Sequence, residues 1–258
     1  MTSGGSDPMS RDVCRTGRRG RARAIFAAFA FGVALLLTAA LAAAGGWWTP
    51  WAARYVQGVD VSWHQGAIDW RALAADDVAF AYIKATEGAD HVDERFAYNW
   101  EQAGAAGLYR GAYHFFTQCQ PGARQAANFI AVVPRVAGAL PHALDLEHMG
   151  PCRQGPTMPD VVAEARAFLD AVQAHYGARP TIYTTREFHD AYLTGVTGER
   201  FWIRSLGVTP RFRQREWVIW QHHNRGHKDG VSGPIDLNAF RGDSAALATF
   251  ATAGRPST

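Results

Sequence analysis

Short apolar runs alternate with amphipathic stretches along most of the chain, and this alternation limits the folds that the sequence can adopt. The apolar runs predict β-strands at residues 57–61, 78–84, 111–116, 142–147, 181–184, 201–204, 217–221 and 235–238, and the amphipathic stretches predict helices at 68–75, 94–106, 123–133 and 159–175. Strands that alternate with helices favour a parallel sheet, which about 200 residues can close into a barrel. Because helices become sparse after residue 184, we predict an irregular TIM-like β/α barrel over residues 57–250, with helices reduced in its C-terminal half.

An apolar segment without a charged side chain, residues 24–44, precedes this domain. As a helix it would be roughly 31 Å long, which is enough to cross a bilayer. Residues 1–23 form a basic head with arginines at 11, 15, 18, 19, 21 and 23, and such a flank stays on the cytoplasmic side of a membrane. We therefore expect a linker at residues 45–56 and a barrel domain outside the cytoplasm.

Two fates of the apolar segment remain open. Trp47, Trp48 and Trp51 lie where an interfacial aromatic belt would sit, which favours an uncleaved membrane anchor facing the periplasm or the cell exterior. The small residues 42–44 instead favour a cleaved signal peptide and a secreted protein. In both cases the domain works outside the cytoplasm.

The net charge of +3 comes from the basic head. That head carries six of the 26 basic and two of the 23 acidic residues, so the remainder of the chain is close to neutral. A near-neutral domain does not have the basic surface that nucleic acids require, and we expect no nucleic-acid partner.

Acidic residues stand at the ends of three predicted strands: Asp60, Asp145, Glu147 and Asp236. In a parallel barrel the C-terminal strand ends meet at one mouth, where active sites lie. Asp145 and Glu147 are two residues apart and point to the same side of a strand. Two carboxyl groups held this close raise one pKa, which leaves a protonated acid of the kind that glycosidases use on the leaving sugar oxygen. Taken alone, the pair could also be two solvated charges at a strand end.

Six sequence blocks resemble the family 25 lysozymes, in the same order and spacing, from residue 57 to residue 240. The blocks are Gly58-Val59-Asp60-Val61-Ser62-Trp63-His64-Gln65-Gly66 with Ile68-Asp69-Trp70, Phe80 to Gly88 (FAYIKATEG), Gly111-Ala112-Tyr113-His114-Phe115, Leu144-Asp145-Leu146-Glu147, Ile182-Tyr183-Thr184, and Trp220-Gln221 with Gly233 to Asn238 (GPIDLN). The sequence departs from the family pattern at Pro234 and at Arg204-Ser205-Leu206-Gly207, where the family usually has a small residue and soon an aromatic one.

The resemblance implies an irregular β/α barrel that hydrolyses the β-1,4 bond between N-acetylmuramic acid and N-acetylglucosamine in peptidoglycan glycan strands. It implies that Glu147 is the general acid, and that Asp145 orients and stabilises the substrate's 2-acetamido group as the nucleophile. Asp60 and Asp236 would complete an acidic floor. The expected cleft contacts, each of which could instead belong to the core, are Tyr82, Tyr113, Tyr183, Trp220 and Gln221. We expect a monomer.

Other functions fit the sequence less well. Family 18 chitinases also end a strand in Asp-x-Glu, but they carry further aspartates upstream where this chain has Ala143 and Pro141. A catalytically inactive wall-binding barrel would lack an acid or its partner, whereas all four carboxylates are present. No His-Glu-x-x-His or Cys-x-x-Cys spacing occurs, so we expect neither a metal site nor a cofactor.

Cys119 and Cys152 are the only cysteines in the part of the chain expected outside the cytoplasm, where disulfides form. They follow neighbouring predicted strands, and we predict that they pair, the alternative being two free thiols. The closed loop of about 33 residues should stabilise the fold by roughly 3–4 kcal/mol. Thiol titration of the unfolded, unreduced exported part should find no free thiol, and finding two would refute the pairing.

Overall fold

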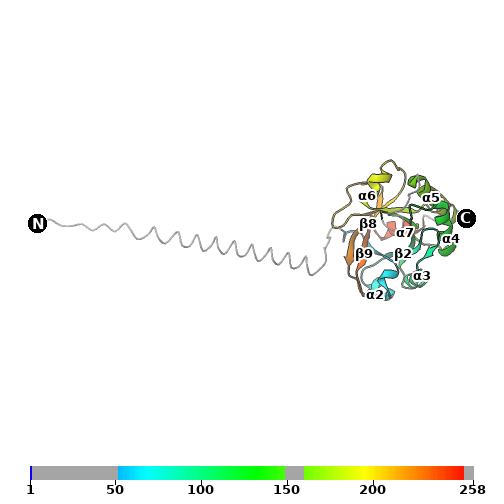
Figure 1. Cartoon of the computed structure of the whole chain (residues 1–258). Coiled ribbons are helices and arrows are strands. Elements are labelled where there is room, and N and C mark those ends of the chain that lie inside the picture. Colours follow the sequence, from blue (N-terminus) through cyan, green and yellow to red (C-terminus); the bar gives the residue numbers. More distant parts are fainter. Residues whose placement is uncertain (2–51, 149–159, 253–258) are drawn as a thin grey trace. The chain divides into compact units, whose positions relative to one another are not determined.

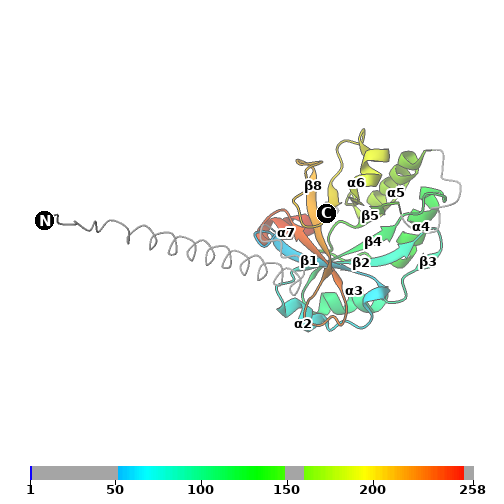
Figure 2. The ribbon, with the colours of Figure 1, turned by 60° about the vertical axis from the view of Figure 1, so that its left-hand side comes forward.

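Eight strands pair edge to edge into a closed barrel (Figures 1 and 2). In spatial order they are β1 (Val56–Val61), β9 (Ile235–Phe240), β8 (Trp217–Gly226), β7 (Phe201–Arg204), β6 (Thr181–Thr184), β5 (Ala143–Leu146), β4 (Tyr109–Phe115) and β2 (Phe80–Glu87). The pairing of β2 with β1 closes the ring, and the short β3 (His91–Val92) adds an antiparallel edge to β2. The predicted β/α barrel is therefore confirmed.

The computed structural model describes Met1 and residues 52–148 and 160–252. Within these ranges no helix is both long enough and apolar enough to span a bilayer. The basic head, the apolar segment 24–44 and most of the predicted linker lie outside the described residues. Cys152 does as well, so its pairing with Cys119, which lies between β4 and α4, stays a prediction.

One strand departs from the parallel arrangement. Strands β1, β2, β4, β5, β6, β7 and β8 are parallel, whereas β9 is antiparallel to both β8 and β1. The reason is the connection between β8 and β9, which contains no helix and so cannot return the chain to the other end of the sheet. Asp236 consequently lies near the beginning of its strand, opposite Asp60 in the register, and still reaches the mouth formed by the ends of the parallel strands.

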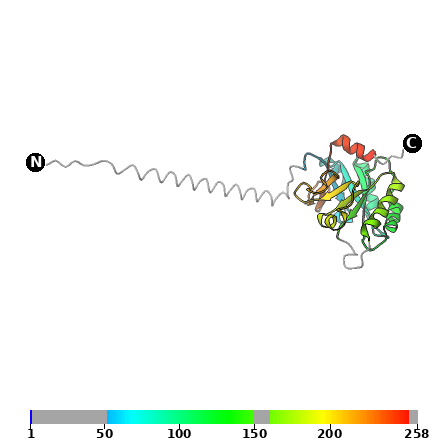
Figure 3. The same cartoon turned by 90° about the horizontal axis from the view of Figure 1, so that it is seen from above.

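Helices cover the first half of the barrel more fully than the second, as predicted. The first half contains α2 (Trp70–Ala75), α3 (Phe96–Ala105), α4 (Gly122–Val132) and α5 (Val161–Tyr176), each lying between successive strands. Only the short α6 (Arg186–Phe188) and the π-helical turn η3 (His189–Leu193) connect β6 to β7, and no helix connects β7 to β8. The terminal α7 (Ser244–Thr252) was not predicted, and it lies apart from α4 and α5 (Figure 3).

The two-residue period of the strands divides the core into two parts. Outward side chains such as Ile83, Leu144 and Ile203 pack under the helices. Inward side chains, among them Phe80, Tyr82, Ala143, Trp202, Ile219 and Phe240, fill the barrel together with Leu247 and Phe250 of α7. Since Phe80 begins β2 and Phe240 ends the antiparallel β9, α7 closes the end of the barrel opposite the acidic mouth.

Helices α4 and α5 pack closely against each other (Figure 1). Asp160 caps the start of α5 by accepting a hydrogen bond from the backbone N–H of Ala163 at 2.9 Å, and Gly177 ends the helix in a left-handed conformation with φ 83°. The N–H of Gly122, at the start of α4, donates to the Glu164 carboxylate at 2.7 Å. A Cβ atom on Gly122 would lie 1.8 Å from the backbone oxygen of Glu164, so only glycine permits this approach.

Replacement of Gly122 by alanine should lower the free energy of unfolding by about 1–3 kcal/mol, since α4 or α5 must shift to relieve the overlap. Gly195→Ala is the matched control, because a Cβ atom there meets no atom within 4 Å. Chemical denaturation of both variants measures the difference. Equal stabilities would show that the two helices are not held at this distance.

Candidate active site

A cleft of about 380 Å³ opens at the mouth of the barrel where the parallel strands end. Its lining residues are Asp60, Ser62, His64, Lys84, Tyr113, Phe115, Asp145, Glu147, Tyr183, Trp202, Arg204, Gln221, Asn224 and Asp236. Most of these side chains stand at the inward-facing positions of their strands. Lys84 is two residues after the inward Tyr82, and Arg204 is two residues after the inward Trp202. The structure thus brings all four predicted carboxylates into one cleft.

Asp145, near the end of β5, and Glu147, just after it, are two residues apart, and both are buried, with exposed fractions of 7% and 9%. Burial and the charge of Glu147 raise the pKa of Asp145 well above its ordinary value. Burial also raises the pKa of Glu147, while the Arg204 guanidinium opposes that increase. The Oδ1 atom of Asp145 is buried and accepts no hydrogen bond from any described residue. The pair therefore holds a proton more readily than solvated carboxyl groups do, and it offers one unfilled acceptor.

Asp60 and Asp236 form a second acidic pair across the β1–β9 ladder. Asp60 Oδ2 accepts hydrogen bonds from Gln221 Nε2 at 2.9 Å and from Asn238 Nδ2 at 2.7 Å. Burial raises the pKa of Asp60, and these two donors oppose the increase by favouring the anion. Burial and the neighbouring charge of Asp60 raise the pKa of Asp236 to about 8. Near neutral pH Asp236 therefore keeps its proton, and the two amide donors favour the anionic form of Asp60.

Ring side chains orient the amides that bind Asp60. Tyr183 Oη donates to Gln221 Oε1 at 3.0 Å, and Trp202 Nε1 donates to Asn238 Oδ1 at 2.8 Å. Each amide then has its nitrogen directed toward Asp60. Because Tyr183, Trp202 and Gln221 also line the cleft, the acidic floor and the aromatic wall form one connected network.

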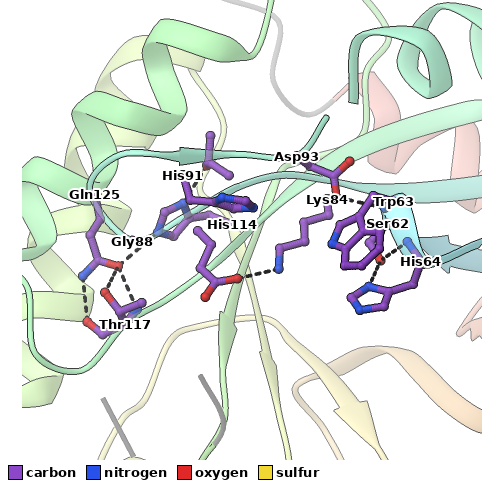
Figure 4. Close-up of polar contacts among 12 residues, drawn as sticks. Ser62, Trp63, His64, Lys84, Gly88, His91, Asp93, His114, Thr117 and Gln125 are labelled. Carbon is purple, nitrogen blue, oxygen red and sulfur yellow. Dashed lines mark hydrogen bonds and ion pairs between the residues drawn. The ribbon is translucent and has the colours of Figure 1, made fainter. Parts of the chain in front are cut away.

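Polar contacts at the rim hold the end of β2 and the loop after β1, which bonds to the segment after β3 (Figure 4). Lys84 Nζ lies 2.7 Å from the Glu87 carboxylate, and Lys84 reaches into the cleft from β2. Ser62 Oγ lies 2.9 Å from His64 Nδ1, and the N–H of Trp63 donates to Asp93 at 2.9 Å (Figure 4). The exposed Trp63 ring stacks on His64 with 4.0 Å between ring centroids. These contacts fix the loop that follows the first strand.

Two of the five expected cleft contacts do not line the cleft. Trp220 is fully buried and faces outward under the helices, because it precedes the inward-facing Gln221 on β8. Tyr82 faces into the barrel, but its Oη donates to the Pro141 carbonyl at 2.8 Å, beyond the N-terminal end of β5 and away from the mouth. Tyr113, Tyr183 and Gln221 do line the cleft.

The sequence prediction did not include three polar residues that act directly on the carboxylates: Lys84, Arg204 and Asn238. The same alternation could have identified them, because each stands two residues after another inward-facing side chain, at 82, 202 and 236 respectively. Within the described ranges, no group of three histidine, cysteine, aspartate or glutamate residues could hold a metal ion.

The Asp236 carboxyl group should titrate near pH 8, against an ordinary value of 3.8, and Asp60→Asn should lower its pKa by removing the neighbouring charge. Carboxyl ¹³C NMR measures both. Native Asp236 keeps a proton that the unfolded chain releases above about pH 4, so the free energy of unfolding should fall as the pH rises from about 4 to about 8. Asp236→Asn should reduce that slope. An Asp236 that titrates near 4 in the unmutated chain would contradict the pairing.

Comparisons with known proteins identify the family that this chain resembles. The family model of the glycosyl hydrolases family 25 matches residues 59–231. The chain is 36% identical over 213 residues to lysozyme M1 of Streptomyces globisporus, covering 76% of this chain and 71% of that protein. It is 36% identical over 203 residues to the N,O-diacetylmuramidase of Chalaropsis sp, covering 70% of this chain and 96% of that one.

Among solved structures, a family 25 glycosyl hydrolase from Bacillus anthracis superimposes with a TM-score of 0.71 at 36% identity, covering 76% of this chain and 94% of that one. The match to the family model, the identity to its members and the shared barrel agree with one another. The chain belongs to the glycosyl hydrolases of family 25.

Proposed function

We propose that this protein is a lysozyme-type muramidase, which hydrolyses the β-1,4 bond between N-acetylmuramic acid and N-acetylglucosamine in peptidoglycan. The observation that carries the proposal is the buried Asp145–Glu147 pair, with its raised pKa values and the unfilled acceptor Asp145 Oδ1. The names of two relatives, a lysozyme and a diacetylmuramidase, support the same reaction.

Glu147 supplies the proton in the first step. As the bond from C1 of the muramic acid residue to the glycosidic oxygen breaks, the Glu147 carboxyl group transfers its proton to that oxygen, which leaves as the hydroxyl of N-acetylglucosamine. The raised pKa of Glu147 makes it hold this proton to a higher pH than a solvated carboxyl group would. Glu147 is then a carboxylate. In the second step it acts as a base and accepts a proton from the water that adds to C1.

Asp145 acts on the substrate's own nucleophile. The carbonyl oxygen of the 2-acetamido group attacks C1 and forms a positively charged oxazolinium ring, and the acetamido N–H donates to Asp145. Asp145 Oδ1 is the free acceptor for this bond. A hydrogen bond to the charged form lowers a carboxyl pKa, so substrate binding favours ionised Asp145 and places the shared proton on Glu147.

The rest of the cleft binds and orients the sugar. Tyr113 and Tyr183 offer rings and hydroxyl groups at the cleft wall, and Gln221 couples the wall to Asp60. Asp60, whose anionic form two amide donors favour, contributes negative potential beneath the developing positive charge. Protonated Asp236 donates to Asp60 and limits the repulsion between the floor and Asp145.

The protein works outside the cytoplasm as a monomer. Peptidoglycan lies outside the cytoplasm, and residues 1–44 have the basic head and the apolar length of an anchor or signal segment. The four carboxylates and the side chains that orient them belong to one barrel, so the proposed chemistry needs no second copy of the chain.

Glu147→Gln should reduce turnover of peptidoglycan by about 10²–10⁴-fold while leaving binding in place, because the amide keeps the shape of the side chain but cannot transfer the proton. Asp145→Asn should be comparably damaging. Muropeptide product analysis and the release of reducing ends measure both effects. In the unmutated enzyme, activity should fall as the pH rises through the pKa of Glu147, and the residual activity of Glu147→Gln should lack that decrease.

Glu101→Gln on the exposed face of α3 is the matched control and should retain full activity. Turnover by Glu147→Gln within a few-fold of the unmutated enzyme would disprove the assignment of β5 as the catalytic strand.

A further inference from the structure

A second pocket of about 480 Å³ lies beside the cleft, where β6 and β7 end. Its lining residues are Thr185, Arg186, Glu187, Arg204, Ser205 and Leu206. We call it the side pocket. Arg204 lines both the side pocket and the cleft, so its side chain stands between the catalytic pair and this second space.

The Arg204 guanidinium is available to a ligand. Its nearest acidic atom, Glu147 Oε2, is 3.8 Å from Nη1, which is longer than a hydrogen bond, and this guanidinium makes no hydrogen bond to another described residue. Arg186, the other cation of the side pocket, is already engaged: Nε lies 2.7 Å from Asp190 Oδ2, and the guanidinium lies over the Phe212 ring. Arg204 is thus the cation of this pocket that makes no hydrogen bond to another described residue, and the pocket also contains the carboxylate of Glu187.

The backbone around Arg204 is held in place. Arg204 ends β7 opposite Gln221 of β8. The next residue, Ser205, donates its N–H to the Gln221 carbonyl at 3.0 Å and accepts the Trp220 indole N–H at 2.7 Å. Leu206 follows with 43% of its surface exposed. A guanidinium on a fixed backbone, beside an exposed apolar side chain, suits a short acyl or peptidyl group that ends in a carboxylate.

We propose that the side pocket binds the substituent on O3 of the muramic acid residue, and that Arg204 binds a carboxylate on it. This inference rests on the proposed function, which places the muramic acid ring against Asp145 and Glu147. The lactyl ether on that ring carries a carboxylate when it bears no peptide, and the peptide stem carries carboxylates when it is present. Both sources have the chemistry that a guanidinium recognises, and Arg204 stands where the sequence departs from the family pattern.

Occupation of the side pocket would also act on the general acid. The positive charge of Arg204 lowers the pKa of Glu147. A carboxylate bound to Arg204 neutralises that charge, so the pKa of Glu147 rises and the acid keeps its proton to higher pH. The substituent that distinguishes N-acetylmuramic acid from N-acetylglucosamine would therefore help Glu147 to keep the proton that it transfers to the adjacent glycosidic oxygen.

Binding of four disaccharides tests the proposal. Each is N-acetylglucosaminyl-N-acetylmuramic acid, with either a free lactyl group or a dipeptide stem, and each is prepared as the carboxylate and as the carboxamide. The proposed reaction does not cleave this linkage, so calorimetry measures Kd without turnover. The full chain should bind a carboxylate form about 10–100-fold more tightly than its carboxamide, and Arg204→Gln should abolish that preference.

The disaccharide pair in which the carboxylate form binds more tightly than the carboxamide identifies the source of the carboxylate. A preference confined to the lactyl pair assigns the subsite to stem-free glycan, and one confined to the dipeptide pair assigns it to the stem. Arg204→Lys should keep part of the preference, and the control Arg166→Gln, on the exposed face of α5, should keep all of it.

Equal weakening of carboxylate and carboxamide forms by Arg204→Gln would overturn the subsite, because it would show that Arg204 acts only on the catalytic pair. A preference that survives Arg204→Gln would overturn it too. The proposed function fails separately, by absence of reducing ends released from peptidoglycan, since the binding measurement does not depend on hydrolysis.

Discussion

The rest of the structure depends on the pairing of β1 with both β2 and β9. The parallel ladder with β2 closes the ring, and the antiparallel ladder with β9 places Asp60 opposite Asp236. Without that closure the inward side chains of eight strands would not share one interior, and the carboxylates of the first, fifth and ninth strands would stand apart. A closed barrel also leaves none of these eight strands as an open edge, which stabilises short strands such as β5 and β6.

Closure of the barrel holds like charges close together, and the chemistry of the site depends on the repulsion between them. Four carboxyl groups are held in one small cleft, and the nearby cations are Lys84 and Arg204. Lys84 is paired with Glu87, so little positive charge remains to stabilise four anions. The result is raised pKa values for Asp60, Asp145, Glu147 and Asp236. The two amide donors favour the anionic form of Asp60, whereas burial favours the protonated form of its neighbours. Unequal hydrogen bonding thus converts a cluster of like charges into a set of acids and bases with different tasks.

Arg204 connects this electrostatic arrangement to substrate choice. It lowers the pKa of Glu147 and also contributes to the potential at Asp60 and Asp236. A guanidinium at this position would reduce the supply of protonated acid unless something neutralised it during catalysis. An anionic group on the substrate meets that requirement, which is why the side pocket and the general acid are best understood together.

The sequence by itself determined the barrel, the strand positions and the four carboxylates, because period-two alternation, helix-forming stretches and the order of the six blocks are local features. It also determined that Asp145 and Glu147 share a side of one strand. Only the tertiary structure decided that β9 runs antiparallel, that Trp220 faces the helices and Tyr82 bonds away from the mouth, and that Arg204 stands between two pockets. These outcomes depend on which strands become neighbours and how far each extends toward the mouth, and such contacts join residues as far apart as Asp60 and Asn238. A pattern read along the chain contains the direction of each side chain relative to its own strand, but it does not contain the position of the strand in the barrel.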